Sequence, residues 1–392
     1  MSGGTRSFEI ARRLVKMGHE VEIITTWLEP TKHVKWFETN EDGVKVHWLP
    51  NLYSNDMNFF KRIFSFIRFS WFATKKALSL NAVDIVFATS TPLTIAIPGL
   101  ITAKIKKIPM VFEVRDLWPS VPIAMGFLKN SIAILIAKKL EIYTYKKSKH
   151  IIALAPGMKR EIASLGVPIN KISVITNGYD PYLFSAQNSK IRSINLRKKF
   201  TWLQNRKLIL FAGAFGRANG VTYLVDIAKE MERIDPEIRF LLIGDGYEKP
   251  LVKNKALNLN ILNKNLFLME PMSKNEIVNW LLISNFSIAL FSGPKILWKD
   301  AVQNKFFDSL GAGVPIACNF RGYQSEIAIK NDVGIIIDKR NAKKAALEIY
   351  EKLIDTDWQR RVAINAKKLA FQQFNFDKLC IKFESILNNA LK

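Results

Sequence analysis

Cysteines and long apolar runs are both scarce in this chain of 392 residues. Its two cysteines, Cys318 and Cys380, lie far apart without a Cys or His neighbour at ligand spacing, which argues against a disulfide framework and against a structural zinc site. The longest apolar stretch, at residues 93–103, is shorter than the roughly 20 residues that span a bilayer. No basic segment leads into an apolar h-region at the N-terminus. We therefore expect a globular, cytoplasmic protein.

Acidic residues are also few, with 34 Asp and Glu against 58 Lys and Arg, so the formal net charge is +24. The excess is local, because residues 57–149 hold fifteen basic and four acidic side chains, whereas residues 1–56 hold seven and eight. Nucleic acid, an anionic membrane surface or a phosphorylated substrate would each match such a patch. A solvated basic face without a partner is the plain alternative.

Short β-branched runs alternate with amphipathic segments along most of the chain, which predicts an α/β architecture with parallel sheets. A polar, basic stretch at residues 185–205 interrupts this rhythm, and we expect it to link a first domain (1–184) to a second (206–373). Residues 374–392 are predicted to form a final helix after a break near Phe374 and Asn375. The expected strands are 21–25, 44–48, 84–88, 110–114, 150–154 and 172–175, then 207–212, 239–243, 266–268, 286–290, 314–317 and 334–337.

Gly3 and Gly4 precede the first helix-like segment, but no strand precedes them. A doubly wound domain normally reaches such a glycine turn from its first strand, and the turn can hold a phosphate. Either this chain lacks that strand or its recorded start lies downstream of the true one. We favour the second explanation.

A second glycine-rich turn, at residues 213–220, is the better candidate for a phosphate site. A helix that follows such a turn offers free N–H groups and a positive dipole end. The turn contains Gly216, Arg217 and Asn219, and the forked guanidinium of Arg217 can bind two phosphate oxygens at once. A glycine turn without such a cation is more simply a tight connection.

Residues 300–315 form a second cluster of candidate binding groups. If a helix starts near Val302, Asn304 and Lys305 could meet a phosphate in its first turns, and Asp308 could accept ribose hydroxyls. A helix cap and a surface carboxylate explain the same residues without a ligand.

Two other segments place polar groups at the ends of predicted strands. Gly244 and Asp245 follow one strand directly, and open parallel sheets bind ligands at that end. Arg115 and Asp116 follow another, which looks buried and contains Glu113. Because buried charges are costly unless they are paired, this run indicates either function or a satisfied Glu–Arg pair.

Several catalytic signatures are absent from the sequence. It has no nucleophile elbow, no His-Glu-x-x-His helix, no complete P-loop and no Asp-x-Asp pair at a predicted strand end. The histidines are scattered and are expected to be structural; they are His19, His33, His47 and His150. The sequence therefore predicts neither a metal nor a cofactor.

Together these segments resemble the retaining GT-B glycosyltransferases of family 4, especially the fucosamine-transferase-like amino-sugar transferases of bacterial O-antigen and capsule assembly. The likeness covers nearly the whole chain. Single motifs are weak, but their order and spacing are specific. They lie at residues 3–7, 11–14, 18–21, 88–93, 113–119 and 155–159, and then at 176–180, 216–220, 244–246, 304–308 and 311–315.

The resemblance implies two Rossmann-like domains that face a cleft, with the nucleotide on the C-terminal domain, the acceptor on the N-terminal one and a final helix that crosses back. It implies that Arg217 and Lys305 hold the donor diphosphate and that Asp308 accepts the ribose hydroxyls. Gly244 and Asp245 would lie near the base of the donor, with Met272 bordering it. The full donor-binding set is Gly3, Gly4, Gly216, Asn219, Gly244, Asp245, Met272, Asp300, Asn304 and Asp308.

Some positions depart from the family pattern. Asp300 stands where many members have the first glutamate of a spaced pair, and Asn219 stands near the place of a lysine. Arg115 and Asp116 occupy a stretch where many members have a histidine beside the reacting sugar, although the fucosamine-transferase-like group shares this run. We therefore add Arg115 and Asp116 to the two donor cations as catalytic candidates.

Residues 57–76 interleave seven aromatic and five basic side chains. Such a helix can lie in a membrane interface with its cations on lipid phosphates. Residues 127–149 join an aliphatic run to several lysines and form a second candidate, and both segments could instead be ordinary helices that pack on a sheet. The residues predicted to meet the membrane or a lipid acceptor are Phe59, Phe60, Lys61, Arg62, Phe66, Arg68 and Trp71.

The residues and the resemblance together predict a retaining, metal-independent glycosyltransferase, peripheral on the inner face of the plasma membrane. It would move a sugar, in the resembling group an N-acetylated amino sugar, from a UDP-sugar to a polyprenyl-diphosphate-linked saccharide. Capsule, O-antigen or exopolysaccharide assembly would be its setting. Two rivals stay open: a nucleotide-sugar epimerase of the same fold, and a nucleic-acid-binding protein, which would leave the glycine turns unexplained.

Overall fold

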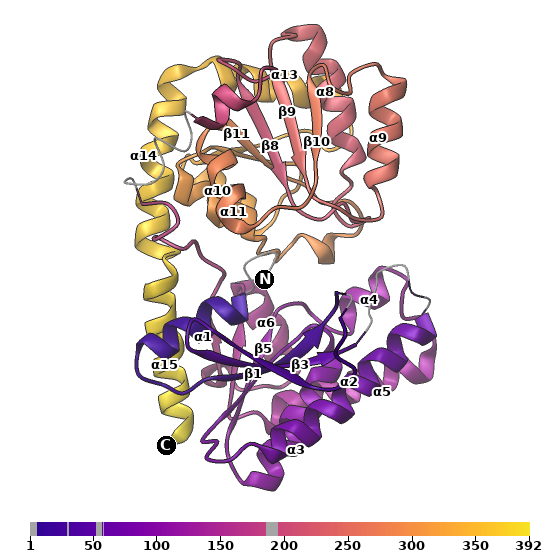
Figure 1. The fold of residues 1–392 in the computed structure, drawn as a ribbon, viewed down its shortest axis with the longest axis vertical. Helices are drawn as coiled ribbons and strands as arrows, with labels where there is room; N and C mark the ends of the chain where they lie inside the picture. Colours follow the sequence, from indigo (N-terminus) through magenta and orange to yellow (C-terminus); the bar gives the residue numbers. More distant parts are fainter. Residues whose placement is uncertain (1–5, 30, 52–56, 58, 186–194) are drawn as a thin grey trace. The chain divides into compact units, whose positions relative to one another are not determined.

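The computed structural model describes residues 6–29, 31–51, 57, 59–185 and 195–392, which form two compact units (Figure 1). Of these residues, 177–378 belong to unit 1, and 6–176 and 379–392 belong to unit 2. The chain changes unit after Thr176 and after Lys378, and the domain boundaries expected at 184 and 374 stay predictions. Residues 186–194 of the expected linker, and Gly3 and Gly4, lie outside the described residues. No helix in the described part is long and apolar enough to cross a membrane.

Unit 1 is a doubly wound α/β unit with a parallel sheet, as the sequence predicts. Its strand order is β10–β9–β8–β11–β12–β13, so the order reverses between β8 and β11. Sheets of this kind bind ligands outside the carboxyl ends of the strands at that point. The strands are β8 (Leu208–Ala212), β9 (Arg239–Ile243), β10 (Leu266–Met269), β11 (Phe286–Ala289), β12 (Ile316–Cys318) and β13 (Gly334–Ile336).

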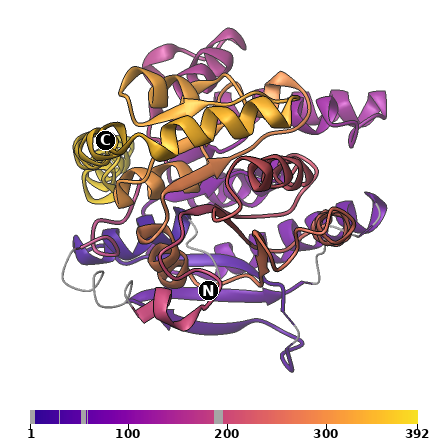
Figure 2. The ribbon, with the colours of Figure 1, turned by 90° about the horizontal axis from the view of Figure 1, so that it is seen from above.

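Helices cover both faces of the unit 1 sheet (Figure 2). Successive strand residues point to opposite faces, so Ile209 and Phe211 of β8 join one core, whereas Leu208 and Leu210 join another. Burial on both faces explains why these strands are almost continuously apolar. The helices are α8 (Thr222–Ile234), α9 (Lys249–Asn258), α10 (Lys274–Leu282), α11 (Asn304–Ala312), α12 (Tyr323–Lys330), α13 (Ala342–Ile354) and α14 (Thr356–Gln373), with a 3-10 turn at Lys295–Leu297.

Unit 2 has two sheets among its described residues, the parallel sheet β4–β5–β6–β7 and the smaller sheet β1–β3–β2. Strand β2, which the sequence analysis did not predict, pairs antiparallel with β3. Asp42 and Gly43, both with positive φ, turn the chain tightly between these two strands. The strands are β1 (Glu22–Trp27), β2 (Phe37–Glu41), β3 (Val44–Pro50), β4 (Val86–Thr89), β5 (Met110–Val114), β6 (His150–Ala153) and β7 (Ile172–Val174).

The last helix of the chain, α15 (Phe376–Leu391), begins after the break expected near Phe374 and Asn375. From Leu379 onward it packs in unit 2, where Phe383 joins a core with Ile10 and Val111. The other helices of unit 2 are α1 (Arg6–Lys16), α2 (Phe59–Ser79), α3 (Ala96–Lys106), α4 (Ser120–Ala124), α5 (Ser131–Lys147) and α6 (Pro156–Ser164), with 3-10 turns at Leu93–Ile95 and Ile169–Lys171.

Candidate functional site

Two glycine turns meet at the carboxyl ends of β8 and β9. The N–H of Gly213, after β8, donates to the carbonyl of Ile243 over 3.0 Å, and the N–H of Phe215 donates to the carbonyl of Asp245 over 2.9 Å. A Cβ on Gly244 would collide with the carbonyl oxygen of Gly213, so this approach requires glycine. The two turns therefore form one backbone surface beside the point where the strand order reverses.

Lys305 lies against this surface from the first turn of α11. Its Nζ lies 3.0 Å from the position that a Cβ on Gly213 would take and 3.8 Å from the centre of the Phe211 ring. Burial lowers the pKa of Lys305 to about 7, although its interaction with Cys318 opposes the shift. A desolvated amine at a helix N-terminus is suited to bind an anion, because the anion would stabilise its charged form.

Arg217 is exposed on the first of these turns, which connects β8 to α8. Its guanidinium carbon lies 4.1 Å from the centre of the Tyr247 ring in the neighbouring turn. Asn219 has an internal role, because its Nδ2 donates to the carbonyl of Ala214 over 2.8 Å and its Oδ1 accepts from the Gln303 side chain over 3.5 Å. The loop is thus shaped by Asn219, and it presents Arg217 to solvent.

Asp308 lies one turn after Lys305 in α11 and is nearly buried. Its Oδ1 lies 3.3 Å from Nζ of Lys274, the first residue of α10. Ser273 and Glu276 form a capping box that fixes the start of α10 and so the position of Lys274. The sequence shows this capping signature but gave no sign that Lys274 would pair with Asp308.

The other predicted donor residues lie around these loops with different exposure. Asp245 and Asn304 are exposed, whereas Met272 is half-buried against the core under β8 and β9. Asp300 is buried in the loop before α11. A Cβ on Gly216 would have ordinary contacts, so this glycine is not required sterically. Within the described ranges, no three His, Cys, Asp or Glu side chains gather as metal ligands would.

The charged run at the end of β5 contains a structural ion pair. Glu113 is fully buried and accepts from Nε of Arg6 over 2.7 Å. The same guanidinium donates to the carbonyls of Ile175 and Thr176 over 2.8 Å and 2.6 Å. The sequence left open whether a Glu–Arg pair explains this run, and the pair exists, but its cation comes from α1 instead of Arg115.

Arg115 and Asp116 form the polar end of β5 in unit 2. The N–H of Arg115 donates to Ser90 Oγ over 3.0 Å, and the Asp116 carboxylate lies 3.4 Å from the Thr91 hydroxyl. Asp116 is exposed on unit 2, but desolvation by nearby protein atoms raises the pKa of its carboxyl group, against the attraction of Arg115. The donor loops lie in unit 1, so a catalytic role for these two residues stays a prediction.

The outward face of α2 is apolar and aromatic. Phe64, Ile67 and Trp71 are 69%, 59% and 61% exposed, and we call these three residues the α2 stripe. The opposite face of the helix buries small side chains, which are Ser65, Ser70 and Ala73. This distribution is the reverse of an ordinary amphipathic helix that packs on a sheet.

Arg68 has an internal role that the sequence did not predict. Its Nη1 donates to the carbonyl of Pro50 over 3.0 Å and to Asn51 Oδ1 over 2.8 Å, so it ties α2 to the end of β3. The other residues predicted to meet lipid lie as follows: Lys61 and Trp71 are exposed, Arg62 and Phe66 are half-buried, and the side chains of Phe59 and Phe60 lie outside the described residues.

Two protein-family models match consecutive parts of the chain. Residues 3–182 match Glycosyltransferase Family 4, and residues 193–369 match Glycosyl transferases group 1. The first match spans most of unit 2, and the second spans most of unit 1.

Individual proteins match over similar ranges. The chain is 21% identical over 397 aligned residues to N-acetyl-alpha-D-glucosaminyl L-malate synthase of Bacillus anthracis, with 99% of the chain and 94% of that relative covered. It is 24% identical over 260 residues to an uncharacterised glycosyltransferase of Methanocaldococcus jannaschii, across 64% of this chain and 63% of that relative. Anabaena HepE in complex with UDP-glucose has a TM-score of 0.68 at 15% identity, over 94% of this chain and all of HepE. This structural likeness shows the GT-B fold.

Proposed function

Because the chain belongs to the GT-B glycosyltransferases of the Family 4 and group 1 type, we propose that it moves a sugar from a UDP-sugar to a polyprenyl-diphosphate-linked saccharide in capsule, O-antigen or exopolysaccharide assembly. We propose an N-acetylated amino sugar, in keeping with the resemblance in the sequence and with the N-acetylglucosaminyl group in the name of the B. anthracis relative. That name also contains malate, so a small soluble acceptor is the alternative that the experiments must separate.

The main support for the donor assignment is that Lys305 lies against the two glycine turns. Arg217 lies in the first of these turns, which follows β8. A half-buried cation and an exposed one would together bind the two phosphates of UDP. Asp308, one turn along α11, would accept the ribose hydroxyls. The UDP-glucose complex of HepE supports a UDP-sugar as the donor.

In the reaction that we propose, the configuration of the transferred sugar is retained. The bond between the anomeric carbon and the diphosphate oxygen breaks, and its electron pair leaves with the diphosphate. The acceptor hydroxyl oxygen bonds to the same face of that carbon, and its proton passes to the departing phosphate oxygen. The protein then needs no nucleophile, but it must stabilise the leaving diphosphate, which positioned cations such as Arg217 and Lys305 do electrostatically.

A lipid-linked acceptor would place the protein on the inner face of the plasma membrane. The α2 stripe supports this location, because exposed aromatic side chains flanked by cations suit a bilayer interface. Helix α5 has a similar distribution, since Ile132, Leu135 and Ile136 are 69%, 53% and 61% exposed while Glu141 and Tyr145 are buried. The excess of basic residues between 57 and 149 would attract anionic lipids.

Thermal unfolding of the purified chain with UDP, GDP and dTDP tests the donor site. UDP at about 100 times its dissociation constant should stabilise the unit that it binds by about 2.7 kcal/mol. We expect a smaller shift with the other two nucleotides and none with UDP in the Lys305→Ala variant. An unchanged unfolding temperature with UDP would contradict the donor assignment.

A transfer assay tests the acceptor. Radiolabelled UDP-sugars are supplied with a polyprenyl-diphosphate-linked saccharide in vesicles, or with L-malate in solution, and the product linkage is determined by NMR. We expect transfer to the lipid-linked saccharide with retained configuration. Transfer to malate alone would refute the lipid acceptor, an inverted linkage would refute the mechanism, and conversion of the UDP-sugar without any acceptor would identify an epimerase.

A further inference from the structure

The glycine turn at residues 213–220 contains one cationic side chain, that of Arg217. The start of α8, which follows this turn, already holds an anion of the protein itself, because the N–H of Val221 donates to Oε2 of Glu248 over 2.8 Å. A carboxylate in this position satisfies the positive end of the helix dipole. A phosphate bound at the turn therefore depends on the direction in which the guanidinium of Arg217 points.

Residues 245–248, in the second glycine turn, fix the backbone on both sides of Arg217. Before Arg217, the carbonyl of Phe215 accepts from the N–H of Glu248 over 2.7 Å. A Cβ on Gly246 would lie 3.0 Å from the carbonyl group of Phe215, and Gly246 has a positive φ, so this close approach favours glycine. After Arg217, the carboxylate of Glu248 holds the start of α8. The loop that carries Arg217 is thus anchored at both ends to one short segment.

The side chain of Arg217 is directed by Tyr247, which belongs to the same short segment. Its guanidinium carbon lies 4.1 Å from the centre of the Tyr247 ring. Tyr247 is 53% exposed, so its ring contacts Arg217 at the surface of the unit and not in the core. The electrons of an aromatic ring attract a cation that lies over its face. The ring therefore favours one direction for a long side chain that would otherwise sample many rotamers in water.

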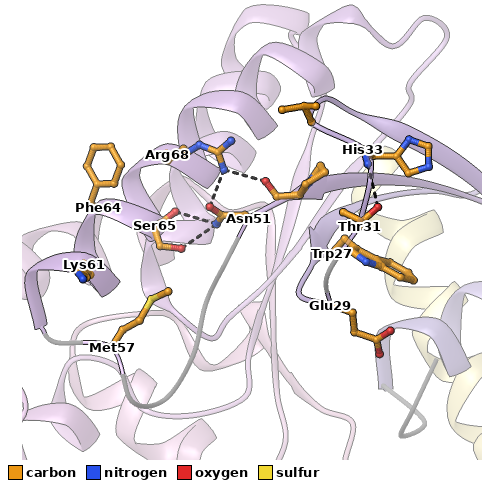
Figure 3. Close-up of a pocket in the computed structure, with 12 residues that line it drawn as sticks. Trp27, Glu29, Thr31, His33, Asn51, Met57, Lys61, Phe64, Ser65 and Arg68 are labelled. Atoms are coloured by element: carbon orange, nitrogen blue, oxygen red, sulfur yellow. Dashed lines mark hydrogen bonds between the residues drawn. The ribbon is translucent and has the colours of Figure 1, made fainter.

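Arg68 shows the other way in which this protein holds an arginine. It lines a cavity of about 810 Å³ between β1, β3 and α2, where its Nη1 donates to the carbonyl of Pro50 and to Asn51 Oδ1 (Figure 3). Those hydrogen bonds are made within the protein. The guanidinium of Arg217, in contrast, has no hydrogen bond or ion pair with any residue that the structure describes. Its N–H donors are therefore open to a ligand, although the side chain is already held by a ring.

We propose that Tyr247 is the positioning residue of Arg217 and holds its guanidinium ready for the donor diphosphate. The other donor cation is held in a similar way, because Nζ of Lys305 lies 3.8 Å from the centre of the Phe211 ring. The identity of the anion rests on the proposed function, whereas the contact between Tyr247 and Arg217 does not depend on it.

Calorimetry with UDP and the full chain tests this role. We expect Tyr247→Ala to weaken UDP binding about two- to fivefold, which is the range of a cation–π contact at an exposed site. Tyr247→Phe keeps the ring and should bind as the wild type does, whereas Tyr247→Leu is apolar without a ring and should behave like Tyr247→Ala. The matched control is Phe371→Ala, which removes an exposed ring of unit 1 that contacts Lys378 and should leave UDP binding unchanged.

A double-mutant cycle separates positioning from a direct contact with the nucleotide. In the Arg217→Ala background, Tyr247→Ala should cause no further loss of UDP affinity, because the ring acts through the guanidinium. Losses that add would mean that the ring itself meets the nucleotide, and they would overturn the proposal. Equal UDP binding by the wild type and Tyr247→Ala would overturn it as well.

NMR with 15N-labelled arginine reports the contact without any ligand. The Nε–H signal of Arg217, identified by its loss in Arg217→Ala, should have a ring-current shift that Tyr247→Ala removes and Tyr247→Phe retains. UDP binding by the wild type without such a shift would refute the positioning role alone. No UDP binding by the wild type would refute the proposed function, and with it the diphosphate as the ligand of Arg217, even where the shift is present.

Discussion

Helices of the two units distribute their apolar side chains in opposite ways. In unit 1, α8 fully buries Leu224, Ile227 and Met231 and turns charged residues outward. In unit 2, α2 buries Ser65 and Ser70 and turns the α2 stripe outward. Both helices are amphipathic, but the apolar face of α8 packs in the protein core, whereas the apolar face of α2 is exposed.

This contrast is in keeping with our proposal that α2 contacts an apolar surface, which α8 does not need. Fully burying one large apolar side chain contributes about 1.5–3 kcal/mol, and α2 forgoes this gain at three positions. Contiguous apolar patches of this kind mark interaction sites or membrane contacts on folded proteins. The basic residues on and after α2 would favour the anionic bilayer that we propose as the surface contacted by this patch.

The largest effect is expected from removing the apolar face itself. The triple variant Phe64→Ser, Ile67→Ser and Trp71→Ser should abolish sedimentation with anionic vesicles, because three side chains that would each contribute about 1.5–3 kcal/mol on burial are lost. The control is Leu251→Ser with Leu257→Ser, which removes two exposed apolar residues from α9 of unit 1 and should leave sedimentation unchanged. Vesicle binding by the triple variant equal to that of the wild type would refute the membrane assignment of α2.

Single truncations should show the same contrast in stability. Leu224→Ala should lower the free energy of unfolding of unit 1 by about 2–5 kcal/mol, because it leaves a cavity in a closed core. Ile67→Ala should change the stability of unit 2 by no more than about 0.5 kcal/mol, because its side chain is exposed. Urea unfolding of both variants measures this difference. A loss in Ile67→Ala as large as that in Leu224→Ala would mean that α2 packs in solution.

Arg217→Ala should separate chemistry in unit 1 from docking in unit 2. Loss of one positioned cation should lower turnover about 10²-fold or more, while vesicle binding stays as in the wild type. Steady-state transfer kinetics and vesicle sedimentation measure the two effects. Arg233→Ala, which removes an exposed arginine from α8, should affect neither. Full activity in Arg217→Ala would show that the diphosphate is held elsewhere.

The pH dependence of UDP binding should report the desolvated amine of Lys305. Its pKa is about 7 in the free protein, and a bound diphosphate would raise it, so binding takes up a proton above pH 7. The affinity should therefore be nearly constant below pH 7 as far as this group is concerned and should fall toward tenfold per pH unit above it. Calorimetry between pH 7 and 9 gives this profile.

Lys305→Arg provides the control for that experiment, because arginine stays charged throughout this range. Its profile should be flat between pH 7 and 9. A slope that persists in Lys305→Arg would assign the titration to another group.

Much of the fold could be predicted from local patterns. The strands of unit 1 were recognisable because burial on both faces demands continuous apolar runs. Strand β2 was missed because Phe37–Glu41 has three polar or charged residues that disfavour strands, and only its pairing with β3 makes it one. Local residue preferences were therefore sufficient to predict the strands of unit 1, but they were insufficient to predict β2.

The candidate site likewise contains features that local sequence predicts and contacts that it does not predict. Gly213 and Gly244 were recognisable because a close approach of two backbones requires glycine. The partner of Glu113 was not, because Arg6 lies 107 positions away in the chain. The contact of Lys274 with Asp308 was not recognisable either, because no pattern in either segment predicts that the two side chains lie close together.

The sequence alone predicted the alternation of strands and helices, the glycine turns and the concentration of positive charge in residues 57–149. Each of these features depends on residues that are near one another in the chain. Folding in three dimensions decided the direction of the α2 stripe, the cation that neutralises Glu113, the lowered pKa of Lys305 and the cavity between β1, β3 and α2. Burial and ion pairing arise between segments that are distant in sequence, so no local pattern could specify them.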